Sequence, residues 1–285
     1  MPFYNFKNLK ITGMASAVPT NIVTSEAFND TLGEEAVNKF VKMTGVKEVH
    51  KTHKNQTASD LGYAAAEKLL TQKGIDRNEI GALIFVAHST DYRRPATACI
   101  LQHRLGITNK DCSVFDVGLG CSAFVYGVQI IGSMMQTADI KYGLLIVGET
   151  MSKMVYPEDK SSNMLFGDAG AAILFEKTEG DSTINALTCS DGSGWKAIVA
   201  PAGGFRNMDA SHEPMIWSDG NPRTLYNTIM DGMAVFNFTI SDVPETMNKF
   251  FEKSGTTVED YDIFALHQAN KFILKQLAKK LGVSM

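Results

Sequence analysis

The stretch DVGLGCSAFVYG at residues 116–127 carries the strongest local signal in the chain. A short apolar run at 112–115 precedes it, and two glycines lead to Cys121. The apolar residues that follow the cysteine are spaced by four, three and four positions, as on one face of a helix: Phe124, Val128, Ile131 and Met135. The sequence therefore predicts a strand-to-helix corner with a thiol on the first turn of the helix.

A thiol in this position can act as a nucleophile. Backbone N–H groups of a first helical turn lack intrahelical partners, and the positive end of the helix dipole favours a thiolate. A buried structural cysteine fits the same local pattern. The stretch alone leaves both readings of Cys121 open.

Composition excludes several classes of protein. The chain has 285 residues and a net charge of −4, with no basic stripe, so we expect no nucleic-acid partner. No apolar run is long enough to cross a membrane, and the first residues do not resemble a signal peptide. Four cysteines without a C-x-x-C pair indicate reduced thiols in a cytoplasmic protein with no metal site. We expect Cys99, Cys112 and Cys189 to lie in the core.

Strands and helices alternate along the chain. Continuous apolar runs at 81–87 and 142–148 are typical of strands that are buried on both faces. The pattern predicts an α/β fold with a mostly parallel sheet. Further strands are expected at 9–18, 167–175, 181–189 and 263–266, and helices at 34–44, 57–73, 96–105, 233–253 and 272–281.

Two segments share the order strand, histidine, loop, helix and Leu-Gly. The first contains His88 and the second His267. Chance similarity explains such a pair, and so does an internal duplication. A duplication would place Cys121 in an N-terminal half (1–178) and His267 in a C-terminal half (179–285). Ligands of open α/β folds bind at the carboxyl ends of strands, so the two residues could meet there.

Four segments together make the chain recognisable: 116–124, PEDKSSNMLFGDAGAAILF at 157–175, MDGMAVF at 230–236 and LHQANKFILKQLAKKLG at 266–282. With them the chain resembles the thiolase-fold condensing enzymes, most closely β-ketoacyl-acyl carrier protein synthase III. The resemblance implies a thiolase-like fold, a duplicated αβαβα layered α/β structure whose second half is incomplete here. It also implies a homodimer.

The resemblance implies an acyltransferase of fatty-acid or related lipid biosynthesis. In that family a cysteine takes an acyl group from acyl-CoA, and a histidine and an asparagine promote decarboxylation of malonyl-acyl carrier protein. Cys121 would be the nucleophile and His267 the decarboxylation histidine. No cofactor is implied beyond the acyl-CoA or acyl carrier protein substrate. Residues that would line the pantetheine channel are Met230, Gly232, Phe236, Ala269 and Asn270.

Departures from the family pattern qualify this expectation. The family asparagine lies about thirty residues beyond the histidine, whereas this sequence ends eighteen after His267. We expect a chain that lacks this segment to condense poorly by itself. Arg94 replaces a phenylalanine of the primer pocket and would suit a polar acyl group. The alternative is that its side chain points into solvent. Lys160 replaces an arginine that contacts CoA.

Two further departures from the family pattern concern the adenine end of the CoA site and the acyl pocket. Lys39 and Met43 stand where typical members carry the tryptophan and arginine that hold the adenine of CoA. A carrier-protein primer is therefore an alternative to acyl-CoA. Ala123 replaces a glycine two residues after the cysteine and would narrow the pocket.

Other functions remain compatible with the sequence. One is acyl transfer to an alcohol or amine without carbon–carbon bond formation. Another is a non-catalytic homologue that only binds acyl carrier protein or a partner subunit. Glu149 follows a strand end near the expected site and is a candidate general base, and we expect His88 to be structural.

Overall fold

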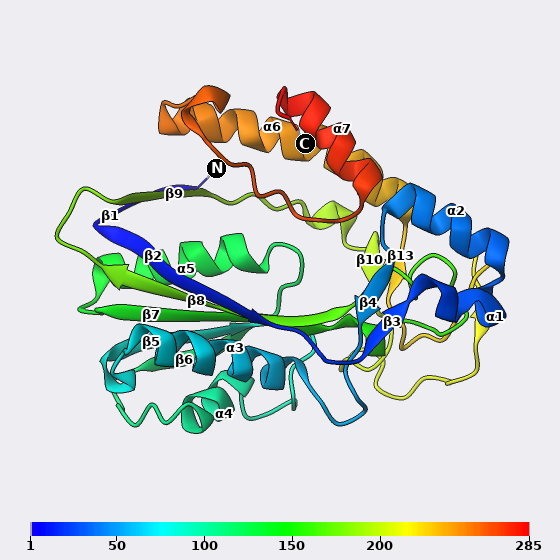
Figure 1. Cartoon of the computed structure of the whole chain (residues 1–285), viewed down its shortest axis with the longest axis horizontal. Coiled ribbons are helices and arrows are strands. Elements are labelled where there is room, and N and C mark those ends of the chain that lie inside the picture. Colours follow the sequence, from blue (N-terminus) through cyan, green and yellow to red (C-terminus); the bar gives the residue numbers. More distant parts are fainter. Residues whose placement is uncertain (1, 285) are drawn as a thin grey trace. The chain divides into compact units, whose positions relative to one another are not determined.

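A computed structural model describes residues 2–284 of the chain, which divides into two compact units (Figure 1). Unit 1 consists of Met1–Asn21, His50–Thr150 and Gly167–Thr188, and unit 2 of Ile22–Val49, Met151–Phe166 and Cys189–Met285. The chain passes between the units several times. The duplicated halves at 1–178 and 179–285 stay a prediction.

Unit 1 is built on a five-stranded sheet in the order β2-β8-β7-β5-β6. Strands β7, β5 and β6 are neighbours in this order and run parallel to one another, with β6 at the edge. Strand β8 runs antiparallel to its two neighbours, β7 and β2. The apolar runs predicted as buried strands form β5 and β7. The strands of the sheet are β2 (Leu9–Ala17), β5 (Ile80–Val86), β6 (Ser113–Val117), β7 (Tyr142–Thr150) and β8 (Asp168–Lys177).

Helices cover both faces of this sheet (Figure 1). On one face α3 (Ala58–Lys73) and α4 (Thr97–Arg104) bury their apolar residues, and on the other face lies α5 (Ala123–Thr137). A separate antiparallel pair joins β1 (Phe3–Lys7) to β9 (Thr183–Leu187), and the 3-10 helix η2 (Arg77–Glu79) precedes β5. Burial on both faces explains why β5 and β7 lack the alternation of a half-exposed strand.

Helix α5 packs unusually close to its neighbours at two glycines. A Cβ atom on Gly127 would lie 2.6 Å from both methyl carbons of Leu145, and one on Gly132 would lie 2.4 Å from the ring of Phe6. Neither position has room for a side chain without a shift of its neighbour. These contacts fix the helix that follows Cys121 against β7 and β1.

Unit 2 contains helices and short two-stranded sheets. The pairs are β3 (Ile22–Thr24) with β4 (Glu48–His50), β10 (Ile198–Val199) with β13 (Ile229–Met230), and β11 (Met215–Ile216) with β12 (Pro222–Arg223). The α-helices are α1 (Asn29–Leu32), α2 (Glu34–Thr44), α6 (Gly232–Ser254) and α7 (Lys271–Leu281), and the 3-10 helices are η1 (Ser25–Phe28), η3 (Met151–Lys153), η4 (Gly192–Gly194) and η5 (Val258–Asp260).

The strand predicted at 263–266 is wrong. These residues are irregular, and Ile263 is 81% exposed. A β-strand needs a partner for its backbone groups. No strand within residues 2–284 pairs with this segment.

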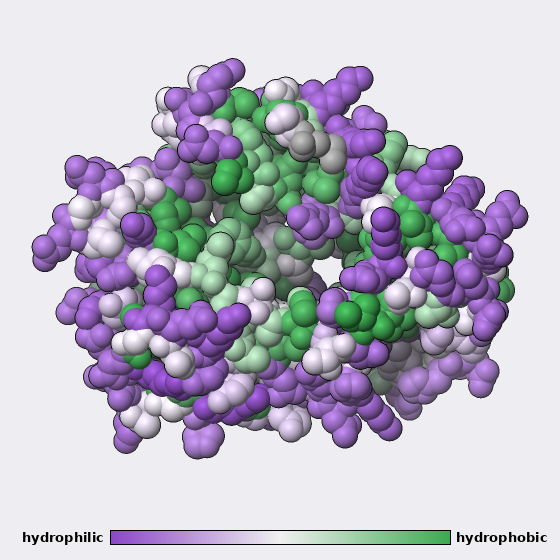
Figure 2. Space-filling view, in the orientation of Figure 1, coloured by the Kyte–Doolittle hydropathy of each residue, from purple (hydrophilic) through white to green (hydrophobic). Residues whose placement is uncertain are grey.

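The face of the molecule drawn in Figure 2 is largely hydrophilic, with apolar side chains interspersed. Exposed apolar residues of unit 2 include Phe205, Ile216, Met233 and Phe238. Within residues 2–284, no helix combines the length and the apolar character that a membrane span requires.

Candidate active site

Cys121 lies at the predicted strand-to-helix corner. Strand β6 ends at Val117 and α5 begins at Ala123, with Ser122 as its N-cap. The corner is confirmed, but the thiol stands one residue before the N-cap and not on the first helical turn. The side chain of Cys121 is exposed within the described structure.

The predicted apolar face of α5 is largely confirmed. Val128, Ile131 and Met135 are buried against the sheet, whereas Phe124 is 42% exposed. The spacing places it on the same face, but at the first turn of the helix it remains accessible.

The pKa of the Cys121 thiol is raised, mainly by desolvation. The charge of Glu149 raises this pKa further, and a hydrogen bond from the backbone N–H of the cysteine lowers it. The expected preference for a thiolate is therefore outweighed in this environment. A raised pKa disfavours the thiolate that a nucleophilic reaction needs.

Glu149 holds the loop that follows β5. One carboxylate oxygen accepts from the backbone N–H of His88 at 2.6 Å, and the other accepts from N and Oγ of Ser89 at 3.2 and 2.7 Å. Oγ of Ser89 in turn accepts from N of Thr150 at 3.0 Å. Hydrogen bonds to both oxygens of Glu149 thus join the end of β7 to the loop after its parallel neighbour β5. This arrangement supports an anchoring role over the general-base role considered from the sequence.

His267 lies in the irregular segment before α7, and desolvation lowers the pKa of its imidazole. A lowered pKa favours the neutral ring at physiological pH. His267 belongs to unit 2 and Cys121 to unit 1. Their meeting stays a prediction.

The residues expected to line the pantetheine channel belong to unit 2. Asn270 caps α7, because its Oδ1 accepts from N of Ile273 at 2.8 Å. The ring of Phe236 stacks on that of Phe272 with centroids 5.5 Å apart, which joins α6 to α7. Met230 ends β13, Gly232 begins α6, and Ala269 precedes the cap of α7. The structure thus groups Phe236 with the start of α7, and a ligand role for all five stays a prediction.

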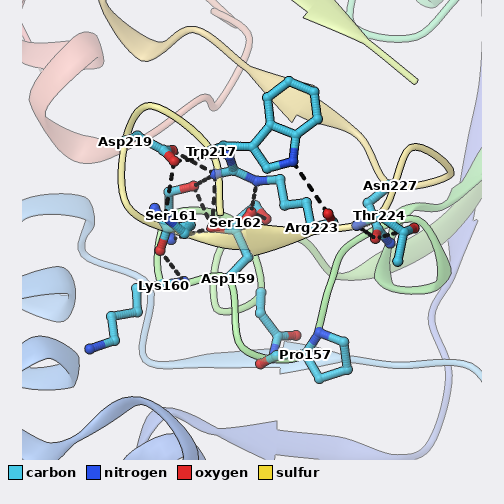
Figure 3. A network of polar contacts seen from close by, with 12 residues as sticks. Pro157, Asp159, Lys160, Ser161, Ser162, Trp217, Asp219, Arg223, Thr224 and Asn227 are labelled. Atoms are coloured by element: carbon cyan, nitrogen blue, oxygen red, sulfur yellow. Dashed lines mark hydrogen bonds and ion pairs between the residues drawn. The ribbon is translucent and has the colours of Figure 1, made fainter. Parts of the chain in front are cut away.

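Lys160 is exposed on a loop, and its backbone N–H donates to Oδ1 of Asn221 at 3.1 Å (Figure 3). Its neighbour Asp159 is fully buried. Arg223 donates from Nε to Oδ2 of Asp159 at 2.6 Å and from Nη2 to Oδ1 at 3.1 Å. Asp219 accepts two further bonds from the guanidinium, at 2.7 and 3.1 Å, and Oγ of Ser161 accepts one from Nη2 at 2.9 Å.

Serines complete this polar network. Oγ of Ser161 and Oγ of Ser162 donate to the two oxygens of Asp159 at 2.7 and 2.6 Å (Figure 3). Desolvation alone would raise the pKa of Asp159, but the bonds from Arg223 and the serines outweigh it and lower the pKa. Bonds from Arg223 hold the pKa of Asp219 at about 2.

No sequence pattern predicted this network. Asp159 is adjacent to Lys160 within the quoted 157–175 segment, but nothing marked it as buried. Arg223 lies in the β11–β12 hairpin, in a region where the sequence predicted no helix or strand. A positive charge inside such a segment is normally solvated, so no local signal distinguished it.

Arg94, Lys39 and Met43, like Lys160, depart from the family pattern and are exposed. Arg94 lies in the loop before α4, and Lys39 and Met43 lie on α2. Polar side chains of α2 around Lys39, including Glu35 and Lys42, line a shallow surface depression. Ala123 is buried at the start of α5.

The four cysteines are free thiols, as predicted. The core positions expected for Cys99 and Cys189 are wrong, because both are exposed. Cys112 is half-buried, and burial raises the pKa of its thiol to about 11.

Comparisons with known proteins match this fold and corner. Residues 115–192 match the family model of 3-oxoacyl-[acyl-carrier-protein] synthase III. A β-ketoacyl-[acyl-carrier-protein] synthase III of Clostridium novyi is 31% identical over 97% of this chain and 82% of its own length. The corresponding protein of Caldanaerobacter subterraneus subsp. tengcongensis is 33% identical over 96% of this chain and 80% of its own.

A solved structure shows the same similarity in three dimensions. The 3-oxoacyl-(acyl-carrier protein) synthase of Burkholderia xenovorans LB400 aligns with a TM-score of 0.92 and 36% identity, over 99% of this chain and 80% of that one. The sheet, its covering helices and the cysteine corner therefore define a condensing enzyme of the thiolase fold. Within that class, the chain belongs to the 3-oxoacyl-[acyl-carrier-protein] synthase III family.

Proposed function

We propose that this chain is an acyltransferase that forms an acyl-Cys121 intermediate and condenses it with malonyl-acyl carrier protein. The observation that carries the proposal is the position of Cys121 at the corner between β6 and α5, within the segment that matches the family model. Family membership supports the condensation, and the relatives' names supply acyl carrier protein as the partner substrate.

In the first step the Cys121 thiolate attacks the carbonyl carbon of an acyl thioester. The new bond forms to Sγ, and the thiol of CoA or of the carrier protein leaves and takes up a proton. A thiolate suits this exchange because it is both a soft nucleophile and a good leaving group. The exposure of Cys121 is consistent with access by a thioester.

In the second step malonyl-acyl carrier protein loses CO₂, and the electron pair of the broken bond forms an enolate. The enolate carbon attacks the acyl carbonyl and releases the Cys121 thiolate. We assign His267 as the donor to the enolate oxygen, because the lowered pKa of its imidazole keeps a neutral N–H available. One such donor typically lowers a barrier by about 3–4 kcal/mol.

Five residues would guide the pantetheine arm to this site: Met230, Gly232, Phe236, Ala269 and Asn270. Lys160 would contact the CoA end of the acyl donor. Exposed Lys39 and Met43 on α2 offer no aromatic surface for an adenine ring, so we also propose that acyl carrier protein competes with CoA as the primer carrier.

The test is acylation of Cys121. The chain is incubated with labelled acyl-CoA and, separately, with acyl-carrier protein, and the modified peptide is identified by mass spectrometry. We expect the label on the peptide that contains Cys121, none in Cys121→Ala, and an unchanged result in Cys99→Ala, which removes another exposed thiol. An intact fold without an adduct from either donor contradicts the proposal.

Product analysis separates the reaction classes. With malonyl-acyl carrier protein added, condensation releases CO₂ and gives a β-ketoacyl product. Acylation of an alcohol or amine without CO₂ release would instead support the other acyltransferase function. Binding of carrier protein that is unchanged in Cys121→Ala, with no turnover by the wild type, would support a non-catalytic homologue.

A further inference from the structure

Titratable and nucleophilic side chains follow or end three neighbouring strands of unit 1, at the carboxyl ends of these strands. Strand β5 is followed by His88, its parallel neighbour β6 by the Cys121 corner, and β7 on the other side ends with Glu149 and Thr150. Val86 pairs in register with both Val117 and Val147, so these three ends lie at one edge of the sheet.

His88 lies directly against the corner. A Cβ atom on Gly120 would stand 3.1 Å from Cδ2 and 3.2 Å from Nε2 of the His88 ring. The edge of the imidazole therefore covers the residue immediately before Cys121. The backbone of Gly120 also supports the helix start, since its carbonyl oxygen accepts from N of Ala123 at 2.8 Å.

The backbone of His88 is bound to Glu149. The 2.6 Å bond from the backbone N–H of His88 to this carboxylate fixes the start of the loop, and the two bonds from Ser89 fix its next residue. The contacts form a continuous chain from the end of β7, through the loop after β5, to the corner after β6.

We propose that His88, anchored by Glu149, is a positioning residue that sets the place of Gly120 and so the presentation of the Cys121 thiol. The proposal rests on the proposed function for its catalytic meaning. It assigns a role to the first histidine of the internal repeat, beyond the general structural role expected from the sequence. An alanine at residue 120 would require the imidazole of His88 to shift by a few tenths of an ångström.

The test is a double-mutant cycle at positions 88 and 120, read by alkylation of Cys121 with iodoacetamide. Gly120→Ala is expected to lower the alkylation rate constant by about threefold or more, a coupling typical of residues in contact. In the His88→Ala background, the alanine at residue 120 contacts no imidazole ring, so it should not lower the alkylation rate constant further. Gly118→Ala is the matched control, because a Cβ there meets no atom within 4 Å.

Two further measurements separate positioning from loss of structure. The urea midpoints of the four variants should agree, since His88 is exposed and its removal opens no core cavity. The rate constant of acylation by a thioester, measured at saturating donor, should be lower in Gly120→Ala than in the wild type. In the double variant this rate constant should return to the value measured for His88→Ala.

The proposal is overturned if alanine at 120 has the same effect with and without His88, or if Gly118→Ala slows alkylation as much as Gly120→Ala. Alkylation needs no acyl donor. A wild-type chain that alkylates normally but is never acylated would contradict the proposed function, while the cycle would still report on the contact.

Discussion

Nε of Arg223 lies 2.6 Å from Oδ2 of Asp159, and the two side chains are only 2% and 1% exposed. The pair links the loop that carries Lys160 to the β11–β12 hairpin of unit 2 (Figure 3). A buried carboxylate without its partner is costly, because neither water nor another charge replaces the lost interaction.

Arg223→Met should therefore destabilise the fold strongly. The variant leaves the Asp159 carboxylate buried without its guanidinium, which typically costs about 3–5 kcal/mol. Urea unfolding monitored by circular dichroism measures the change. The control is Lys141→Met, which breaks an exposed pair with Glu79 and should cost less than about 1 kcal/mol. Equal losses in the two variants would contradict a structural role for the buried pair.

Acid should weaken the same region. The pKa of Asp219 is about 2 in the folded chain, against an ordinary value of 3.8. The unfolded chain therefore binds the proton more readily, and the stabilisation from this carboxylate is lost as pH falls from about 4 towards 2. Urea midpoints measured across this range should fall less steeply in Asp219→Asn than in the wild type. Parallel curves for the two proteins would refute this assignment.

Glu149→Gln should make the Cys121 thiol more acidic. The charge of Glu149 raises the thiol pKa, so its removal stabilises the thiolate. The pH midpoint of iodoacetamide alkylation should move to lower pH. Glu176→Gln is the matched control, since Glu176 pairs with Tyr142 at the opposite end of β7. An unchanged midpoint in Glu149→Gln would show that this charge does not reach the thiol.

Gly170→Ala should destabilise unit 1. A Cβ there would lie 2.5 Å from the backbone N of Gly62 and 2.5 Å from the backbone carbon of Leu61. Because these atoms belong to the backbone of α3, they cannot rotate away, and we expect a loss of about 1–3 kcal/mol or more. Gly180→Ala, where a Cβ meets nothing within 4 Å, should leave the urea midpoint within error. A tolerated alanine at 170 would mean that α3 packs less closely on β8.

Local sequence patterns were sufficient for most elements of unit 1. The apolar runs of β5 and β7 and the helical spacing after Cys121 each predicted the element that the structure contains. The pattern failed at 263–266, where an apolar run found no partner strand within residues 2–284. Strand formation depends on a neighbour that the run itself does not specify.

The sequence by itself determined the family, the cysteine corner and the alternation of strands and helices, because these depend on residues close together in the chain. Only the tertiary structure paired Arg223 with Asp159, placed His88 against Gly120 and bound both oxygens of Glu149 to a neighbouring loop. These contacts join segments about 30 to 64 residues apart. Burial and hydrogen bonding between such segments arise from packing, and no local spacing encodes them.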